Sequence, residues 1–551
     1  MAPGRLSALL PWLLLAAALG LFAWDMRMVQ PQGDDAFISY RYARNLVEGR
    51  GLVYNPGERV EGYTNLLWML MVAGGLELGL QAETAGHLLS LLSGMAALLL
   101  ALVYTRACLP PGRGWLAGFA PLLLLSSPSF AVWSSSGMET PLFTAALTAA
   151  LAAEARRRPA LLTAALAVAS LTRPEGALAA AVLYGFHLHR GRNRLGAALR
   201  PVLVYGCLLL ALTLFRLLYY QAWLPNTFYA KVGGLPLATG AVYLTGCLLS
   251  GPLILLATAL AAGARRWGAA LPGAALVGAF SVYIVWVGGD AYNQWRFFLP
   301  LLPALISLAV RGCSEALDEH RDLGLALFAG LGATALFYLL GSDGAPVLIT
   351  LALAVAFYLA IRRPPVDRSR LAAALVLAAV LALNPLACLA FDLVVRSRGT
   401  VAVTLAPSRA VALAQTRKFY RLMDRIARRQ SRMILQRCAD DCPVAALSIG
   451  MFGYYSRLPI IDVAGIVDPV ISRSRVGHDY PKLLRFPGHY KTNADYVLAY
   501  RPRFVLVEAR SERMLPVSAR LLDHPSFGRD YEYDPVLLGF ARRQRGAAKG
   551  E

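Results

Sequence analysis

Apolar stretches long enough to cross a lipid bilayer recur from Leu6 to about Phe391, and they limit the possible folds more than any other feature. A helix needs about 20 mostly apolar residues to cross the hydrocarbon core. Only 16% of the 551 residues are charged, whereas soluble domains carry about a quarter. The chain beyond this region is far more polar. The sequence therefore predicts an all-α polytopic membrane domain over residues 1–392 and a C-terminal α/β extracytoplasmic domain over residues 393–551.

Arginine clusters fill the short gaps between apolar stretches and predict the topology. Short loops rich in Arg or Lys stay in the cytoplasm. With these clusters inside, the chain threads through about 13 crossings, near 6–24, 84–105, 115–132, 140–155, 159–171, 176–188, 200–220, 240–262, 269–287, 297–311, 322–340, 345–361 and 371–392. The short segments 159–171 and 176–188 are expected to be tilted, broken or re-entrant. This topology puts the N-terminus in the cytoplasm and the C-terminal domain outside the inner membrane.

Two alternative interpretations of these features are weaker. A cleavable signal peptide has an apolar core of about 7 to 15 residues, and the stretch from Leu6 to Trp24 is longer, so we expect an uncleaved first helix. The formal net charge of +21 could suggest a nucleic-acid partner. Because the arginines occupy inward loops, the topology signal explains much of the charge, and we expect membrane lipids but no nucleic acid as partners.

The unusual polar motifs of the membrane half all fall on the outward face of this topology. They lie in five islands, and polar groups near membrane depth often mark a substrate path. The islands hold the acid pair Asp34 and Asp35 with Tyr40, Arg41, Glu61, Tyr63 and Asn65; Glu139; Arg173 and Glu175; Asn226, Tyr229 and Lys231; and Asp290 with Arg296. Each island alone also has a structural explanation, such as a helix start, a capped turn or an interface anchor.

The residue types in these islands suit a substrate with a phosphate, a polar ring and an apolar tail. Arg41, Arg173, Lys231 and Arg296 are candidate phosphate ligands, since Arg binds phosphate through two hydrogen bonds and Lys supplies a point charge. The remaining island residues, Tyr40, Glu61, Tyr63, Asn65, Glu139, Glu175, Asn226, Tyr229 and Asp290, are candidate substrate-binding groups. A carboxylate beside a hydroxyl can act as a general base. This chemistry indicates sugar transfer from a polyprenyl phosphate, a donor available where nucleotide sugars are absent.

Several of these motifs resemble those of a known group. The run Asp34-Asp35-Ala36-Phe37-Ile38-Ser39-Tyr40-Arg41, with Tyr54-Asn55-Pro56-Gly57 and Glu61-Gly62-Tyr63-Thr64-Asn65, resembles the first outer loop of bacterial GT-C glycosyltransferases. The likeness is greatest to the mycobacterial terminal β-(1→2) arabinofuranosyltransferases and their relatives, some labelled flagellar motor control proteins. Similar motifs follow at 171–176, 224–231, 296–300 and, in the tail, 461–469.

The resemblance implies a GT-C fold, an outward active-site cavity and a polyprenyl-phosphate pentose donor, such as decaprenyl-phosphoryl arabinofuranose, with a cell-envelope glycan as acceptor. The family's loop acid falls on Asp34 or Asp35, and Asp34 is assigned the acid/base role because that acid tends to come first in such a pair. In an extended segment the two side chains would point to opposite faces. Asp35 would then orient the acceptor, bind a divalent cation or cap the following helix. No other cofactor is expected.

The polar tail carries its own expectations. A basic amphipathic helix is predicted over 407–436, and strands over 444–449, 459–463 and 503–508. Gly450 and Gly453 weakly resemble a dinucleotide turn, but one partial glycine pattern is poor evidence, so a structural turn is expected. Cys438 and Cys442 predict a short-loop disulfide if the tail is extracytoplasmic, with free thiols as the alternative. The tail is expected to bind acceptor glycan or to cover the cavity.

Two other functions remain as alternatives. A transporter or flippase of lipid-linked sugars would also need an outward cavity, but alternating access usually brings internal repeats and a midplane site, and neither is evident in the sequence. A non-catalytic envelope protein or motor-associated protein is the second alternative, against which the intact acid pair argues.

Overall fold

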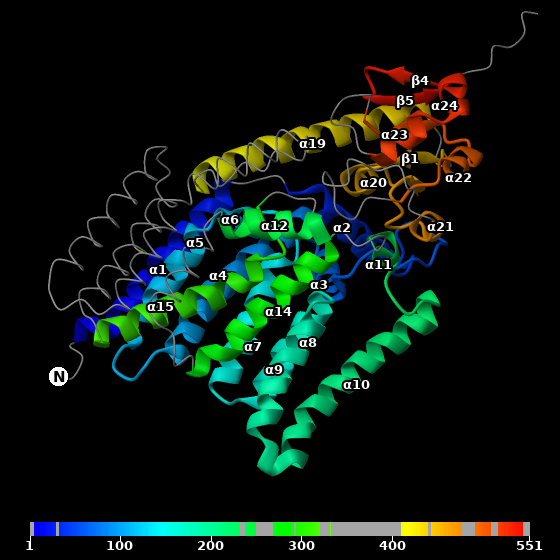
Figure 1. Cartoon of the computed structure of the whole chain (residues 1–551). Helices are drawn as coiled ribbons and strands as arrows, with labels where there is room; N and C mark the ends of the chain where they lie inside the picture. The colour runs from blue at the N-terminus through cyan, green and yellow to red at the C-terminus, as the bar shows by residue number, and fades with distance from the viewer. Residues whose placement is uncertain are drawn as a thin grey trace, which may run out of the picture. The chain divides into compact units, whose positions relative to one another are not determined.

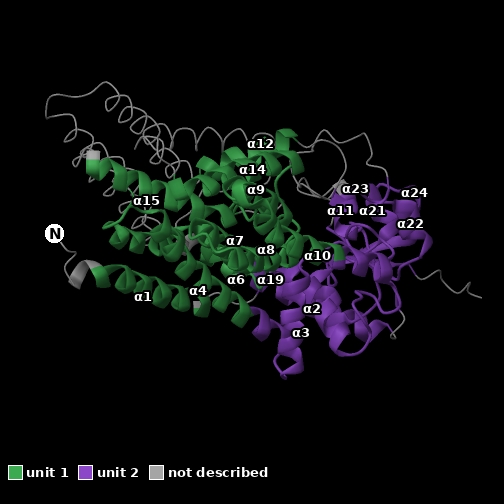
Figure 2. Cartoon of the chain, turned by 90° about the horizontal axis from the view of Figure 1, so that it is seen from below, with its two compact units in different colours: residues 1–30, 87–210, 237–417 green, residues 31–86, 211–236, 418–551 purple. Residues whose placement is uncertain are grey.

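The computed structural model describes residues 5–28, 32–231, 237–249, 268–290, 294–319, 331, 409–438, 442–474, 491–508 and 516–543. The chain forms two compact units (Figure 2). Unit 1 contains residues 1–30, 87–210 and 237–417, and unit 2 contains residues 31–86, 211–236 and 418–551. The first outer loop therefore folds with the C-terminal tail. The predicted domain boundary at 392/393 lies outside the described residues and stays a prediction.

Unit 1 is built from apolar helices, which are labelled in Figure 1. They are α1 (Arg5–Met28), most of α4 (Ala82–Cys108), η1 (Gly114–Gly118), α5 (Phe119–Ser126), α6 (Pro128–Ser135), α7 (Thr140–Ala155), α8 (Pro159–Thr172), α9 (Gly176–Arg190), η2 (Arg192–Arg194), the first part of α10 (Leu195–Tyr220), α12 (Leu237–Leu249), η3 (Gly268–Ala270), α14 (Leu271–Val287), η4 (Leu299–Leu301) and α15 (Leu302–Glu319).

Five helices among the described residues are long and apolar enough to cross a membrane, or six if one bent pair counts as a single span. Four shorter apolar helices, of 10–17 residues, accompany them. These helices confirm a multi-pass membrane protein. The predicted crossings 322–340, 345–361 and 371–392 lie outside the described residues, apart from Leu331 in helical conformation, so the total of about 13 stays a prediction.

The predicted crossing at 115–132 is bent at one residue. Helices Gly114–Ser126 and Pro128–Ser135 meet at 65°. Ser127 between them is extended, with φ −66° and ψ 122°, as expected because proline disfavours the helical conformation of the residue before it. By contrast, α8 and α9 are each continuous, with 14 and 15 residues. Neither predicted segment is therefore broken internally, and their tilt or re-entry stays a prediction.

Unit 2 begins with α2 (Asp34–Val47), which starts directly at the acid pair, and α3 (Leu66–Glu77). Asp34 and Asp35 occupy the first helical turn, where carboxylates are stabilised by the helix dipole. The expectation of an extended segment is therefore wrong. The capping prediction for Asp35 is also wrong, because the N-cap is Gly33 and no side chain caps this helix.

The tail folds around a five-stranded mixed sheet with the order β2-β1-β3-β5-β4. Strands β1 (Val444–Ala446), β2 (Ile460–Asp462) and β3 (Phe504–Leu506) are parallel, and β5 (Gly539–Arg542) pairs antiparallel with β3 and with β4 (Tyr531–Asp534). The three predicted strands are confirmed, although shorter. The hairpin of β4 and β5 was not predicted, because its strands are short and mostly polar or half-exposed.

Buried aliphatic residues such as Ala445, Val505 and Leu521 form the core beside this sheet, and helices accompany it in the chain. The helices are α11 (Asn226–Lys231), α19 (Arg409–Arg437), α20 (Gly450–Ser456), α21 (Pro469–Ser472), α22 (Ala494–Ala499), α23 (Pro516–Leu522) and α24 (Pro525–Asp530). The basic helix predicted for 407–436 is confirmed as α19. The disulfide between Cys438 and Cys442 is also present, so the α/β class of the tail and its predicted cross-link are confirmed.

Candidate functional site

The acid pair is joined to the tail through Asp34. Its two carboxylate oxygens accept the backbone N–H groups of Gly450, at 3.1 Å, and Met451, at 2.7 Å. These N–H groups lie in the first turn of α20, where helices leave backbone donors unpaired and favour anions. Burial raises the pKa of Asp34 to about 6, and the neighbouring Asp35 charge adds to this, while the two backbone hydrogen bonds oppose it.

The two glycines of α20 permit this close approach. A Cβ atom at Gly450 would lie 1.9 Å from the carbonyl oxygen of Asp34, and one at Gly453 would lie 1.9 Å from the hydroxyl of Tyr54. The glycines that resembled a dinucleotide turn are thus required by packing. The anion at this helix end is the Asp34 carboxylate, in accord with the structural turn expected from the sequence.

Arg41, a predicted phosphate ligand, is enclosed by protein acceptors. Its side chain donates to the backbone carbonyls of Tyr54, Gly453 and Leu458, each at 2.8 Å, and to Oδ1 of Asn55 at 3.2 Å. The residue is 3% exposed. Phosphate binding by Arg41 would require these hydrogen bonds to break, so its contacts favour a structural role in joining α2 to the loop after α20.

Aromatic contacts extend the same junction. The hydroxyl of Tyr54 donates to the carbonyl of Ile449 at 2.6 Å, and Arg44 donates to the carbonyl of Tyr454 at 2.7 Å while its guanidinium lies over that ring. Tyr40 is fully buried and donates to Gln32 Oε1 at 2.5 Å. The first outer loop and the β1–α20 segment therefore form a continuous hydrogen-bonded core within unit 2.

Glu61 has a partner that the sequence analysis missed. Its carboxylate accepts both hydrogen bonds from Nε of Arg216, at 3.0 Å each. Burial raises the pKa of Glu61, and Arg216 opposes this rise. Arg216 stands alone in the apolar run Thr213-Leu214-Phe215-Arg216-Leu217-Leu218. An ionisable residue in an apolar helix usually marks a functional or paired site, and this signal could have identified it.

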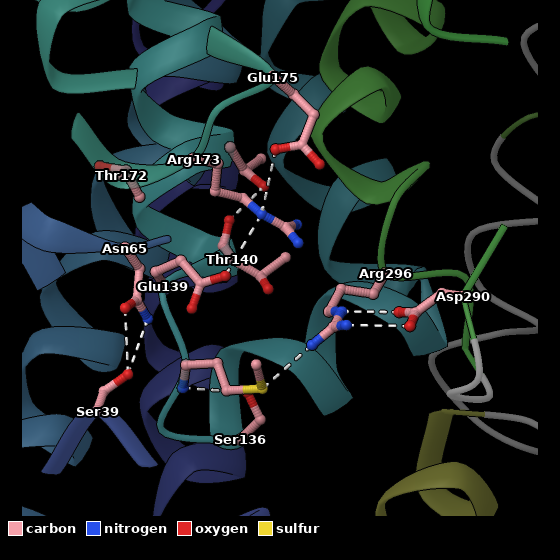
Figure 3. A network of polar contacts seen from close by, with 12 residues as sticks. Ser39, Asn65, Ser136, Glu139, Thr140, Thr172, Arg173, Glu175, Asp290 and Arg296 are labelled. Carbon is pink, nitrogen blue, oxygen red and sulfur yellow. Dashed lines mark hydrogen bonds and ion pairs between the residues drawn. The ribbon is translucent and has the colours of Figure 1, made fainter. Parts of the chain in front are cut away.

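Tyr63 and Asn65 have partners in the same unit. The hydroxyl of Tyr63 lies 3.0 Å from that of Tyr220, which itself donates to the carbonyl of Leu52. Asn65 pairs with the hydroxyl of Ser39 at 3.0–3.2 Å (Figure 3). These contacts fix the course of the first outer loop.

The motif at 224–231 is bound to the tail motif 461–469. Asn226 Nδ2 donates to the carbonyls of Gly465 and Ile466, each at 2.9 Å, and its Oδ1 accepts the hydroxyl of Ser472. The carbonyl of Tyr229 accepts a hydrogen bond from Nζ of Lys491 at 2.7 Å. Lys231, the predicted phosphate ligand, ends α11 with an exposed side chain. Asn226 thus uses both ends of its amide group in protein contacts.

Asp462 organises the tail side of this contact. It is fully buried at the end of β2 and accepts the N–H groups of Ala464 and Val467, each at 2.9 Å. Burial raises its pKa to about 6, against the effect of these hydrogen bonds. Asp468 then caps α21 by accepting from Val470 and Ile471. The tail signature is therefore a loop held by two aspartates.

A second cluster lies within unit 1, where Arg173 stands between two carboxylates (Figure 3). Its Nε is 3.4 Å from Glu139 Oε1 and 3.8 Å from Glu175 Oε2. Glu139 is the N-cap of α7, Arg173 the C-cap of α8 and Glu175 the N-cap of α9. Three helix ends thus meet at this group. Tyr283 of α14, which was not predicted, donates to Glu175 at 3.2 Å.

Arg296 forms the third ion pair of this cluster. Its Nε and one terminal nitrogen contact the two oxygens of Asp290, at 2.7 and 3.0 Å (Figure 3). The Phe297 ring lies 5.2 Å from the Arg173 guanidinium and 5.6 Å from that of Arg296. The ring of Trp133, another unpredicted member, lies 5.2 Å from Arg296. Two cations, three carboxylates and two aromatic rings thus form one group in unit 1.

The predicted site residues therefore separate into two groups. The structure brings Glu139, Arg173, Glu175, Asp290 and Arg296 together in unit 1. It places Asp34, Asp35, Tyr40, Arg41, Glu61, Tyr63, Asn65, Asn226, Tyr229 and Lys231 in unit 2. In the described part of the chain, no group of three or more His, Cys, Asp or Glu side chains is arranged to hold a metal ion.

The apolar helices, the buried ion pairs and the α/β tail define a multi-pass membrane protein with a polar cluster in unit 1. Residues 414–546 match a family model described as Domain of unknown function (DUF8728). The chain is similar to two proteins named terminal beta-(1->2)-arabinofuranosyltransferase. It is 30% identical to that of Mycobacterium tuberculosis over 253 residues, 42% of this chain and 40% of the relative. It is 29% identical to that of Corynebacterium glutamicum over 360 residues, 54% and 50% of the two chains.

The chain thus spans about half the length of these curated relatives or less. The chain also has a low similarity to two solved structures. ArnT from Cupriavidus metallidurans bound to undecaprenyl phosphate is 16% identical, with a TM-score of 0.48 and coverage of 82% of this chain and 85% of that chain. Arabinosyltransferase EmbB from Mycobacterium smegmatis is 15% identical, with a TM-score of 0.37 and coverage of 73% and 42%. The likeness to arabinofuranosyltransferases expected from the motifs is therefore confirmed.

Proposed function

We propose that this protein is an integral membrane glycosyltransferase of the GT-C type. It transfers a sugar, a pentofuranose such as arabinofuranose, from a polyprenyl-phosphate donor to a cell-envelope glycan on the extracytoplasmic face. The observation that carries the proposal is the pair Asp34 and Asp35 in the first turn of α2, where Asp34 accepts two backbone hydrogen bonds from the tail. The names of the two curated relatives support the same reaction class.

The transfer needs one base and one phosphate site. An acceptor hydroxyl attacks the anomeric carbon, the bond from that carbon to the phosphate oxygen breaks, and polyprenyl phosphate leaves with the bonding electrons. The hydroxyl proton passes to a carboxylate of the acid pair. Arg173 and Arg296 of unit 1 and Lys231 of unit 2 each remain predicted ligands of the donor phosphate, because cations stabilise a departing phosphate.

The hydrogen bonds favour different roles for Asp34 and Asp35. Both oxygens of Asp34 are used by backbone N–H groups of α20, which suits a positioning residue. Asp35 follows in the same helical turn, where consecutive side chains are about 100° apart around the axis. We therefore assign proton transfer to Asp35 and anchoring to Asp34, the reverse of the order suggested by the motif. A divalent cation at Asp35 remains a separate prediction.

The decisive experiment is a transfer assay on the purified full-length protein with a panel of polyprenyl-phosphate sugars and a cell-envelope glycan acceptor. Sugar transfer that depends on Asp35 is expected. Movement of an intact lipid-linked sugar across proteoliposomes without transfer would instead indicate a flippase. Absence of both activities across the panel would support a non-catalytic envelope protein.

A further inference from the structure

An apolar groove lies on unit 1, lined by residues other than those of the polar cluster. It has a volume of about 430 Å³ and is formed by α4, α7 and α8. Its walls are small and aliphatic, and two arginines are the charged members of the lining. The lining residues include Leu100 and Val103 of α4, Ala149 and Ala153 of α7, Ala164 of α8, and Arg156 and Arg158 at the turn.

The groove exists because the facing surfaces of α7 and α8 carry alanine. Lining positions Ala145, Ala146, Ala149, Ala152 and Ala153 of α7 face Ala164 and Ala165 of α8 across it. Alanine side chains leave a channel where larger aliphatic residues would fill the space. The α7 lining runs from Leu142 to Ala153, which at 1.5 Å per residue is about 17 Å. One leaflet of the hydrocarbon core is about 15 Å thick, half of about 30 Å.

The turn between the helices places two cations at one end of this channel. Arg157 has a left-handed backbone, with φ of 56°, and its N–H bonds to the carbonyl of Glu154. The chain reverses there, and Arg156 and Arg158 on either side both line the groove. Arg156 also donates to the carbonyl of Val103 on α4 at 3.2 Å, which holds its guanidinium near the groove.

The acid closest to this turn is already paired. Glu154, in the last turn of α7, is buried and forms an ion pair with Arg190 of α9. The arginines of the groove therefore keep a positive field at its end. A channel of one-leaflet length with two guanidinium groups at its mouth matches a lipid that has a long acyl chain and an anionic phosphate.

We propose that this groove binds an anionic phospholipid, with one acyl chain along the alanine walls and the phosphate on Arg156 and Arg158. The site is separate from the transferase function proposed above, since its residues include none of the predicted site residues. A phospholipid suits the groove because its acyl chain spans a single leaflet. Binding of this kind would fix the α7–α8 hairpin in the Arg-bearing leaflet.

The test is native mass spectrometry of the full-length protein in detergent with added phosphatidylglycerol or phosphatidylethanolamine of equal chain length. Wild-type protein is expected to retain phosphatidylglycerol about tenfold more than phosphatidylethanolamine, a difference of about 1.4 kcal/mol. Both lipids carry the phosphate, but the ammonium group of phosphatidylethanolamine cancels its net charge and is repelled by the two arginines. The double variant Arg156→Gln/Arg158→Gln should lose this preference. The matched control Arg192→Gln/Arg194→Gln, which changes two exposed arginines of η2, should keep it.

A second variant tests the channel itself. Ala164 is exposed and lines the groove, so Ala164→Phe should fold normally and block acyl-chain entry, lowering phosphatidylglycerol retention while both arginines remain. Equal retention of the two lipids by wild-type protein would overturn the proposal. So would unchanged retention in the Arg156→Gln/Arg158→Gln variant, or preferential retention of a polyprenyl phosphate added in competition.

Discussion

The carboxylate of Asp34 accepts the backbone N–H of Met451 at 2.7 Å, although the two residues are 417 positions apart in the chain. This hydrogen bond joins the first outer loop to the start of α20 in the tail. Arg41, Arg44 and Tyr54 reach carbonyls of the same segment. The segment that carries the acid pair is thus held by the C-terminal domain, and changes in the tail should affect the acid pair.

The two acids should respond differently to loss of charge. Asp35→Asn is expected to abolish sugar transfer and leave the melting temperature close to that of the wild type. Asp34→Asn replaces one acceptor oxygen by an N–H₂ group facing a backbone donor, and should destabilise the protein by about 0.5–2 kcal/mol. Transfer rates and thermal unfolding of both variants provide the measurement. Wild-type transfer by Asp35→Asn together with an inactive, stable Asp34→Asn would reverse the assignment.

Gly453 should not tolerate a side chain. A Cβ atom there would lie 1.9 Å from the Tyr54 hydroxyl and 2.8 Å from Arg41, so Gly453→Ala is expected to cost about 1–3 kcal/mol through forced displacement of packed groups. The matched control is Gly528→Ala in α24, where a Cβ would meet nothing within 4 Å. Thermal unfolding should separate the two, and equal melting temperatures would contradict the packing role.

The stability of the tail should depend on pH through Asp462. Its pKa is raised from 3.8 to about 6 in the folded protein, so the folded state binds the proton more tightly than the unfolded state. Protonation of Asp462 therefore adds up to about 3 kcal/mol to the free energy of unfolding. This stabilisation is fully present below about pH 4 and is lost as the pH rises through about 6. Thermal unfolding across this range should show a weaker pH dependence for Asp462→Asn than for wild type.

The control for this titration is Glu532→Gln, which alters an exposed carboxylate of β4. It should keep the wild-type dependence. The same slope in Asp462→Asn and wild type would show that Asp462 does not titrate in this range.

The cations of unit 1 should bind the donor phosphate. Arg173→Gln and Arg296→Gln are each expected to weaken donor binding by about 1.5–3 kcal/mol, the usual contribution of a charge-assisted hydrogen bond. Because Arg296→Gln also leaves Asp290 without its ion-pair partner, the double variant Arg296→Gln/Asp290→Asn should recover stability but not affinity. Titration calorimetry with the lipid-linked sugar measures the affinity, and thermal unfolding measures the stability. Unchanged donor affinity in these variants, with reduced acceptor affinity, would exchange the assigned roles.

The predicted topology can be tested directly. Reporter fusions after Glu551 and near Gly57 should both show extracytoplasmic activity, because the Arg-rich loops are expected to stay in the cytoplasm. Fusions near Arg157 should show the opposite. A cytoplasmic signal at both Gly57 and Glu551 would place the acid pair on the wrong side for the proposed donor.

Local patterns in the sequence determined the elements of this protein. Apolar length predicted the membrane helices, short apolar runs predicted three strands of the tail, and the spacing of Cys438 and Cys442 predicted the disulfide. These features depend on neighbours a few residues apart, so a single sequence suffices to predict them. The acidic and basic islands were also identified by residue type, because ionisable groups beside apolar segments are uncommon.

Only the tertiary structure decided which islands belong together and what their side chains contact. Arg41 looked like a phosphate ligand, but two of its four acceptors are carbonyls more than 400 residues away. The sequence analysis did not single out Arg216, and the structure shows that it donates to Glu61. The glycines of α20 were expected only to form a turn, and the structure shows that Gly450 and Gly453 make room for Asp34 and Tyr54. Such contacts join distant segments through backbone groups that every residue carries, so residue identity alone does not reveal them.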